Sequence, residues 1–393
     1  MKQILILLIL LNIVFNSYGQ QYRKLHMQSI VVDSHNDIIT AAFEKGVSFD
    51  QDLKGITHSD LQRLAEGGID VQVFSIWCDG LQKNPFAYAN RQIDTLYAVA
   101  GRNTSKMAII RTPDDLARAV SQHKLAAMIG VEGGHMIEND VEKLDSLFRR
   151  GARYMTLTWN NSTPWATSAM YETLDTLQLQ PKGLSYAGKA IVRRMNKLGM
   201  MVDLSHVGEA TFRDAIAETT KPVIVSHSCV YKLCPVFRNL KDDQILAVAK
   251  NKGVIQVNFF SLFLDSNYQQ KNKTFLLAHT AERDSLLKLN PEPYFADNKL
   301  AEKYASEVDA LKAPLSLLID HIDYIVKLAG IDHVGLGSDF DGIPSPPQQL
   351  NDVTTMPLIT KELLARGYNK KDIRKILGQN FIRVFTQNAA TKN

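Results

Sequence analysis

Short runs of apolar and β-branched residues recur along the chain, and most are followed by stretches with the periodicity of an amphipathic helix. The runs predict strands at 29–33, 70–77, 126–131, 153–158, 200–204, 222–226, 253–258 and 333–337. The stretch 186–198 shows the helical pattern well, because Ala187, Ile191, Val192 and Met195 fall on one face. The pattern therefore predicts eight buried strands that alternate with helices.

This alternation predicts an α/β fold, specifically a closed (β/α)₈ barrel, or TIM barrel. The alternative is an open, doubly wound sheet, which calls for a glycine-rich phosphate-binding turn after an early strand. Gly130, Gly133 and Gly134 do not have the G-x-G-x-x-G spacing, so the barrel is favoured.

The N-terminus has the pattern of a secretory signal peptide at 1–19. Lys2 precedes an apolar core at 4–15, and the small residues Ser17 and Gly19 stand where a signal peptidase cuts. A buried first helix is the alternative. We expect export, either by secretion or into a periplasm. The apolar core is short for a bilayer and the C-terminus is polar, so we expect no stable membrane anchor after cleavage.

Residues 20–393 are expected to form a single barrel domain with one insertion at about 259–312. The insertion is charged and rich in Asn and Lys in its middle, and we expect it to have its own helices and to cover the barrel mouth. The stretch 313–330 is predicted as the helix before the last strand, and 371–386 as a terminal helix.

Composition and charge exclude little. The net charge is +4 and falls by one when Lys2 leaves with the leader, which is too weak a bias to indicate a nucleic-acid partner. The three cysteines, Cys78, Cys229 and Cys234, leave at least one thiol free, and a Cys229–Cys234 bridge stays open.

Residues able to bind a metal follow several of the predicted strands. They are His35 and Asp37 after the first strand, Glu132 after the third, His206 after the fifth, His227 after the sixth, and Asp339 and Asp341 after the eighth. In a parallel barrel these strand ends converge on one mouth, where active sites lie. Each residue alone has a simpler explanation, such as a hydrogen-bonded histidine, a turn or a helix cap. Their joint placement favours a metal site.

The residue types indicate which metal. Imidazole and carboxylate without thiolate suit Zn²⁺ or a similar divalent ion. At least five of these residues are expected to be ligands, namely His35, Asp37, Glu132, His206 and His227. They exceed the four ligands of one tetrahedral ion, which predicts two ions that share a bridging carboxylate. Two ions about 3.5–4 Å apart can hold a bridging hydroxide and polarise a carbonyl together.

Six ordered segments resemble the membrane dipeptidase (renal dipeptidase) family, peptidase family M19. They are 32–37 (VDSHND), 130–133 (GVEG), 203–207 (DLSHV), 225–228 (VSHS), 335–342 (GLGSDFDG) and 377–381 (LGQNF). The similarity runs in order from about His35 to Phe385 and so covers nearly the whole expected mature chain. It implies a barrel of the metal-dependent hydrolase (amidohydrolase-like) type.

The resemblance also implies a role for each residue. His35 and Asp37 would bind one zinc, His206 and His227 the other, and Glu132 would bridge the two. Asp339 would be the general acid/base that passes a proton to the leaving amine. Arg238 would hold the substrate carboxylate, for which a guanidinium fork has the right geometry.

One position departs from the family pattern. The segment 154–165 resembles the family's fourth strand, but Trp159 stands where the family usually has a His that contacts the substrate and supports the tetrahedral intermediate. Trp159 is either a substrate contact or a packed aromatic residue. The rate of hydrolysis and the substrate preference depend on which of these two roles Trp159 has.

The leading interpretation is a zinc-dependent dipeptidase that hydrolyses the peptide bond of dipeptides by means of a metal-bridging hydroxide. One alternative is a hydrolase that acts on another amide or an ester at the same two-zinc site. Another is a catalytically inactive, metal-containing binding protein. The expected partner is a dipeptide substrate and not nucleic acid. Relatives are often dimers, so a homodimer is an expectation from the resemblance.

Overall fold

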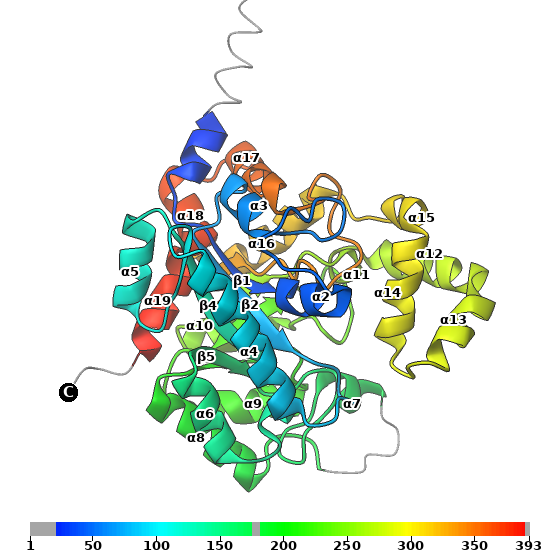
Figure 1. Cartoon of the computed structure of the whole chain (residues 1–393), viewed down its shortest axis with the longest axis horizontal. Coiled ribbons are helices and arrows are strands. Elements are labelled where there is room, and N and C mark those ends of the chain that lie inside the picture. Colours follow the sequence, from blue (N-terminus) through cyan, green and yellow to red (C-terminus); the bar gives the residue numbers. More distant parts are fainter. Residues whose placement is uncertain (1–20, 175–180, 390–393) are drawn as a thin grey trace, which may run out of the picture.

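Parallel strands form the centre of the computed structural model, which describes residues 21–174 and 181–389 (Figure 1). The strands are β1 (Val32–Asn36), β2 (Val71–Trp77), β3 (Met107–Ile109), β4 (Leu125–Glu132), β5 (Ala152–Thr156), β6 (Met201–Asp203), β7 (Ile224–Ser228), β8 (Val254–Val257) and β9 (Val334–Leu336). They lie in the order β1-β2-β4-β5-β6-β7-β8-β9, and β3 pairs with β4 outside this path. A parallel bridge between Asn36 and Phe340 joins the two ends of the sheet. The sheet is thus a nearly closed barrel, and the predicted (β/α)₈ fold is confirmed.

Helices cover the outside of the barrel (Figure 1). They are α2 (Ile38–Lys45), α3 (Leu61–Glu66), α4 (Pro85–Arg102), α5 (Pro113–Ser121), α6 (Val141–Arg149), α7 (Ala169–Leu174), α8 (Tyr186–Leu198), α9 (Glu209–Glu218), α10 (Asp242–Lys250), α11 (Ser261–Leu264), α12 (Ser266–Ala278), α13 (Thr280–Leu287), α14 (Pro293–Lys303), α15 (Ala305–Asp309), α16 (Leu315–Ala329), α17 (Pro357–Ala365), α18 (Lys370–Arg374) and α19 (Asn380–Asn388). The predicted terminal helix is divided, because a π-helical turn at Lys375–Gln379 separates α18 from α19. Within the described residues, no helix is both long enough and apolar enough to cross a membrane.

The observed strand bounds differ from the predicted ones in a way that matters for the site. β1 runs from Val32 to Asn36 rather than over 29–33, and β4 ends at Glu132. His35, Glu132 and His227 therefore lie within the last residues of strands and not in the loops that follow. The reason is that backbone pairing continues to the ligand positions, as in the pairing of Trp77 with Glu132. The pattern did not predict the three-residue strand β3.

The end of the barrel at which the strands begin is filled by the C-terminal helix α19. Phe381 and Phe385 of α19 belong to the same buried cluster as Val32 and Val71, near the starts of β1 and β2. Burying such aromatic rings is a main source of stability in a domain of this size. The C-terminal part of the chain therefore serves the fold and lies at the opposite end from the predicted site.

Closer to the C-terminal ends of the strands, a tyrosine side chain extends across the barrel interior. Tyr154 of β5 is fully buried and faces Gly130 of β4. A Cβ atom on Gly130 would lie 2.1 Å from the Tyr154 Cζ atom. The glycine leaves the room in which the tyrosine ring packs.

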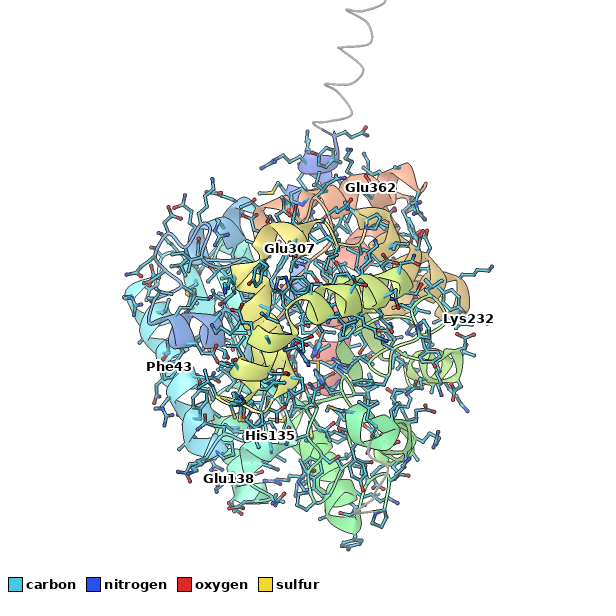
Figure 2. The ribbon with its side chains drawn as sticks, turned by 90° about the vertical axis from the view of Figure 1, so that its right-hand side faces the viewer. Phe43, His135, Glu138, Lys232, Glu307 and Glu362 are labelled. Carbon is cyan, nitrogen blue, oxygen red and sulfur yellow. The ribbon has the colours of Figure 1, made fainter. Side chains whose placement is uncertain are left out.

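The segment between β8 and α16 forms α11 to α15. Figure 1 shows α12 to α15 on one side of the barrel, and Figure 2, seen from that side, shows them in front of the other elements. Phe275, Leu300 and Val308 give the segment a small core of its own. Tyr294 of α14 contacts the barrel, where its ring packs edge-on against Trp77 and Trp159. The Tyr294 hydroxyl donates to Asp79.

The predicted leader falls at 1–19, outside the described residues. The three cysteines are all described, and all are free and buried. The Cys229 thiol donates to the carbonyl oxygen of Asn258 at 3.2 Å, and that of Cys234 to the carbonyl oxygen of Leu262 at 3.3 Å. The Cys229–Cys234 bridge is therefore not formed.

Candidate metal centre

The predicted ligands meet at the C-terminal ends of the barrel strands, with Glu132 at their centre. Its Oε2 atom lies 3.1 Å from His35 Nε2. Its Oε1 atom lies 2.9 Å from His206 Nε2 and 3.5 Å from His227 Nε2. The two oxygens of one carboxylate thus face different histidines, and the ligand atoms of His35, Glu132 and His227 all lie within 4.8 Å of one another.

Asp37 completes the group around His35. Its Oδ2 atom is 3.4 Å from His35 Nε2, and its buried Oδ1 atom has no hydrogen-bond partner. Gly342, in the loop after β9, lies against this carboxylate. A Cβ atom on Gly342 would be 2.3 Å from Asp37 Oδ2 and 2.8 Å from Asp339 Oδ1. The loop therefore needs a glycine here to approach the centre so closely.

The hydrogen bond at the far side of His35 determines its tautomer. The Tyr154 hydroxyl lies 2.9 Å from His35 Nδ1 and donates its own proton to the Ser34 carbonyl oxygen at 3.1 Å. The hydroxyl can therefore only accept from His35, whose proton must be on Nδ1. The Nε2 lone pair is left to face Asp37 and Glu132.

The other two imidazoles have the same arrangement. The Ser226 hydroxyl donates to Asp203 at 2.6 Å and accepts from His227 Nδ1 at 2.8 Å. Asn160 Oδ1 lies 3.1 Å from His206 Nδ1 and accepts its proton. In all three histidines Nε2 is the free ligand atom, and the other ring N–H is held by an acceptor, as is usual for metal-binding histidines.

These side chains fit a pair of divalent ions. The Nε2 atoms of His206 and His227 lie only 2.9 Å apart with lone pairs on both, and the buried Nε2 of His35 has no hydrogen-bond partner. Such lone pairs repel each other unless a cation lies between them. Two ligands at about 2.0–2.2 Å from one tetrahedral ion are roughly 3.3–3.6 Å apart. The separations found here run from 2.9 to 3.5 Å, so they fall in this range or a few tenths of an ångström below it.

The charges favour the same interpretation. Burial lowers the pKa of His206 to about 3 and lowers the pKa of His227 well below its usual range, so both imidazoles are neutral, as ligands must be. Burial also disfavours a charged His35, but the electrostatic influence of the Tyr154 hydroxyl and of the Glu132 and Asp37 carboxylates outweighs it and raises the pKa of His35 well above the ordinary value. The surroundings of His35 Nε2 thus favour a positive charge at this point.

Asp339 lies at the edge of the centre. Its Oδ1 atom is 3.9 Å from His35 Nε2. Burial, with the nearby Asp37 and Glu132 carboxylates, raises the pKa of the Asp339 carboxyl group well above its usual range. Asp341 lies apart from the ligands, because its carboxylate accepts hydrogen bonds from the backbone N–H of His58 and the hydroxyl of Ser59.

Arg238 is buried beside the second ligand group without a carboxylate partner among the described residues. Its guanidinium makes only long hydrogen bonds, to the Ser228 hydroxyl at 3.4 Å and to the His227 carbonyl oxygen at 3.5 Å, and lies over the Phe263 ring. Burial lowers the pKa of Arg238 to about 10, so the group stays charged at neutral pH. Arg238 and His206 line a cavity of about 800 Å³. A buried, unpaired cation in a cavity is suited to bind an anionic group.

Trp159 packs near His206. Its side chain is buried, and its ring centroid lies 5.1 Å from Trp77, 5.3 Å from Tyr294 and 6.3 Å from His206. The rings of Trp77, Trp159 and Tyr294 form a cluster that joins α14 to the neighbourhood of His206. Trp159 thus contacts both the insertion and a predicted ligand.

Sequence reasoning missed the residues that fix the histidine tautomers, which are Tyr154, Asn160 and Ser226. Tyr154 carried a usable signal, because a tyrosine inside a buried strand needs a partner for its hydroxyl. Ser226 and Asn160 gave none, since polar residues near strand ends are common.

Comparisons with known proteins identify the family to which this chain belongs. The model of the membrane dipeptidase family (peptidase family M19) matches residues 19–393. An uncharacterized dipeptidase of Schizosaccharomyces pombe is 32% identical over 387 residues, which cover 93% of this chain and 82% of that protein. Human dipeptidase 3 is 29% identical over 363 residues, which cover 91% of this chain and 64% of the human protein.

Solved structures share the fold. The probable dipeptidase PvdM from Pseudomonas aeruginosa superposes with a TM-score of 0.77 at 26% identity, covering 95% of this chain and 98% of that one. A metallo peptidase from Rhodobacter sphaeroides, liganded with a phosphinate mimic of the dipeptide L-Ala-D-Ala, gives a TM-score of 0.73 at 21% identity, covering 92% and 100%. The chain belongs to the membrane dipeptidase family, peptidase family M19, and is therefore a metallo-dipeptidase by class.

Proposed function

We propose that the protein is a two-zinc dipeptidase that hydrolyses dipeptides with a free C-terminal carboxylate. The observation that carries the proposal is the position of Glu132, whose Oε2 atom faces His35 and whose Oε1 atom faces His206 and His227. His35 and Asp37 would hold one ion, His206 and His227 the other, and Glu132 both. Two zinc ions in this place would supply a hydroxide nucleophile at neutral pH and polarise the scissile carbonyl.

The chain's own residues would bind and orient the substrate. Arg238 is buried, charged and without a carboxylate partner among the described residues, so a substrate carboxylate would supply the missing counter-ion. Its place next to His227 would bring the adjacent peptide bond toward the ligands.

Asp339 would move the proton. Its Oδ1 atom faces the centre, and its raised pKa favours a carboxyl group that takes up a proton and gives it back. In hydrolysis it would accept the proton lost by the attacking water and donate it to the leaving nitrogen. This step turns a poor leaving group into a neutral amine.

Trp159 is proposed to restrict the substrates. Its indole ring has no hydrogen-bond acceptor and only one N–H donor, whereas a histidine can donate, accept or carry a positive charge. We propose that the enzyme acts on a narrower or bulkier set of dipeptides than its relatives that have histidine here. The zinc pair would then supply most of the stabilisation of the developing oxyanion.

An assay of dipeptide hydrolysis with and without added Zn²⁺ tests the function. The first pair is L-Ala-L-Ala and L-Ala-D-Ala, because the Rhodobacter sphaeroides relative carries a mimic of the latter. Turnover of a free dipeptide that stops on chelation and returns with Zn²⁺ is expected. Turnover restricted to N-acylated amides or esters would favour the alternative hydrolase. Two zinc ions per chain with no turnover on any of these substrates would favour the binding protein.

Export by the leader at 1–19 and dimer formation stay proposals. N-terminal sequencing of the protein recovered outside the cytoplasm would test the first. Light scattering on the purified protein would test the second.

A further inference from the structure

Asn258 follows β8, at a strand end where the sequence indicated no functional residue. Its side chain is fully buried. Asn258 Oδ1 accepts from the backbone N–H of Phe260 at 2.5 Å. A backbone N–H can only donate, so this bond fixes which end of the amide is oxygen. The Nδ2 group therefore faces Asp339, and it donates to Asp339 Oδ2 at 2.8 Å.

The hydrogen bond from Asn258 determines the orientation of the Asp339 carboxylate. Asp339 is held in the left-handed region, with φ of 60°, and its backbone N–H donates to the His35 carbonyl oxygen at 3.0 Å. These contacts fix the backbone but leave the carboxylate free to rotate about its last bond. Among the described residues, Asn258 is the side chain that donates to this carboxylate, and it holds Oδ2 away from the ligands. Oδ1 is left to face His35 Nε2 at 3.9 Å.

Without the donor, the carboxylate has a competing position. His35, Asp37 and Asp339 offer ligand atoms that all lie within 4.8 Å of one another. A carboxylate free to turn would be drawn toward a cation held by His35 and Asp37, and a carboxylate bound in that way is a poor proton carrier.

We propose that Asn258 is a positioning residue that holds the Asp339 carboxylate in the orientation for proton transfer and keeps it from becoming a metal ligand. The inference rests on the proposed role of Asp339. Asn258 does not touch the reacting atoms and acts through the bond from its Nδ2 atom.

Asn258→Ser is the variant of choice. A serine hydroxyl can still accept from the N–H two residues later, as in turns, but it is too short to reach Asp339. Loss of a residue that orients a group at a metal site typically costs about 10–100-fold, so we expect kcat to fall by that factor. KM and the zinc content per chain should stay nearly unchanged. Asn196→Ser is the matched control, because Asn196 is also buried but, among the described residues, its side chain accepts hydrogen bonds from Thr219 and Thr220, away from the site.

A double-mutant cycle with Asp339→Asn separates positioning from a general structural effect. Once Asp339 has lost its proton-carrying role, adding Asn258→Ser should reduce kcat by less than about threefold, since coupled residues are not additive. An undiminished further loss, a loss of zinc in Asn258→Ser, or unchanged kcat in that variant overturns the inference. Asp339→Asn with normal turnover refutes the proposed role of Asp339, and this inference with it.

Asn258→Ala is the second variant if the serine protein does not fold. It removes the same donor and is measured in the same cycle, with circular dichroism to check the fold. The same losses of kcat support the proposal, and the same exceptions overturn it.

Discussion

At the scale of single residues, the proposed centre depends on the hydrogen bonds at the far side of each imidazole. The hydrogen bond from His35 to the Tyr154 hydroxyl links β1 to β5 across the barrel interior. Tyr154→Phe should therefore weaken zinc binding by about 10–100-fold, because His35 would lose the acceptor that fixes its tautomer. Zinc affinity measured by competition with a chelator checks this.

The control for Tyr154→Phe is Tyr324→Phe. Tyr324 also donates its hydroxyl proton, but to the exposed Asp242 on the outside of the barrel. Its loss should leave zinc affinity unchanged. Equal affinities for the two variants would show that the Tyr154 bond has no part in metal binding.

Arg238→Ala should mainly raise KM for dipeptides with a free carboxylate, by roughly 10–100-fold, since bonds to charged groups contribute about 1.5–3 kcal/mol. Amidated dipeptides should be nearly insensitive. Steady-state kinetics on matched free and amidated substrates decide the matter. Arg283→Ala, at the rim of the same cavity and already paired with Asp297, is the control. Equal losses on both substrate types would exclude the carboxylate clamp.

Trp159→His should raise turnover on small dipeptides and leave the zinc content alone. The reason is that a histidine near the carbonyl oxygen adds a donor, and one such donor contributes about 2.7–4 kcal/mol in other enzymes. The measurement is kcat/KM over small and bulky dipeptides. A specificity profile that does not change would mean that Trp159 serves only to pack against Trp77 and Tyr294.

At the scale of elements, the packing of β4 against β5 couples the barrel interior to the metal centre. Gly130→Ala would place a methyl group 2.1 Å from the Tyr154 ring. The ring would have to shift, at a cost of about 1–3 kcal/mol or more in stability, and its bond to His35 would be disturbed. The melting temperature measured by thermal unfolding and the affinity for zinc should therefore both decrease.

Gly101→Ala is the control for that substitution. Gly101 lies in α4 with no atom within 4 Å of an added Cβ. Alanine there should stabilise the protein by about 0.5–1 kcal/mol, because glycine is a poor helix former. If Gly130→Ala also stabilises the protein, the Tyr154 ring does not need the room that Gly130 leaves.

At the scale of the whole molecule, the barrel and the centre contribute to stability in different ways. The barrel carries a large continuous core, so removal of metal by a chelator should leave the chain folded. It should lower Tm by about 5 °C or more, because a tightly bound ion stabilises the native state by several kcal/mol. Calorimetry before and after Zn²⁺ is restored tests this, and an unchanged Tm after full removal of zinc would contradict it.

The sequence by itself determined the barrel and the residues that meet at its mouth. The eight predicted strands are all present, and α8 spans the predicted 186–198, because hydrophobic periodicity is a local property of the chain. The convergence of His35, Glu132, His206 and His227 also followed from the sequence, since the C-terminal ends of parallel barrel strands share one face.

Only the tertiary structure decided what surrounds those residues. Tyr154 reaches His35 from 119 positions away, and Asn258 reaches Asp339 from 81 positions away. Such contacts depend on the register between strands and on which side chains enter the barrel, and neither leaves a periodic trace in the sequence. For the same reason the packing of α14 against Trp159 could not be foreseen. The course of an insertion depends on the surface against which it packs, and here that surface is an aromatic pair, Trp77 at the end of β2 and Trp159 in the loop after β5.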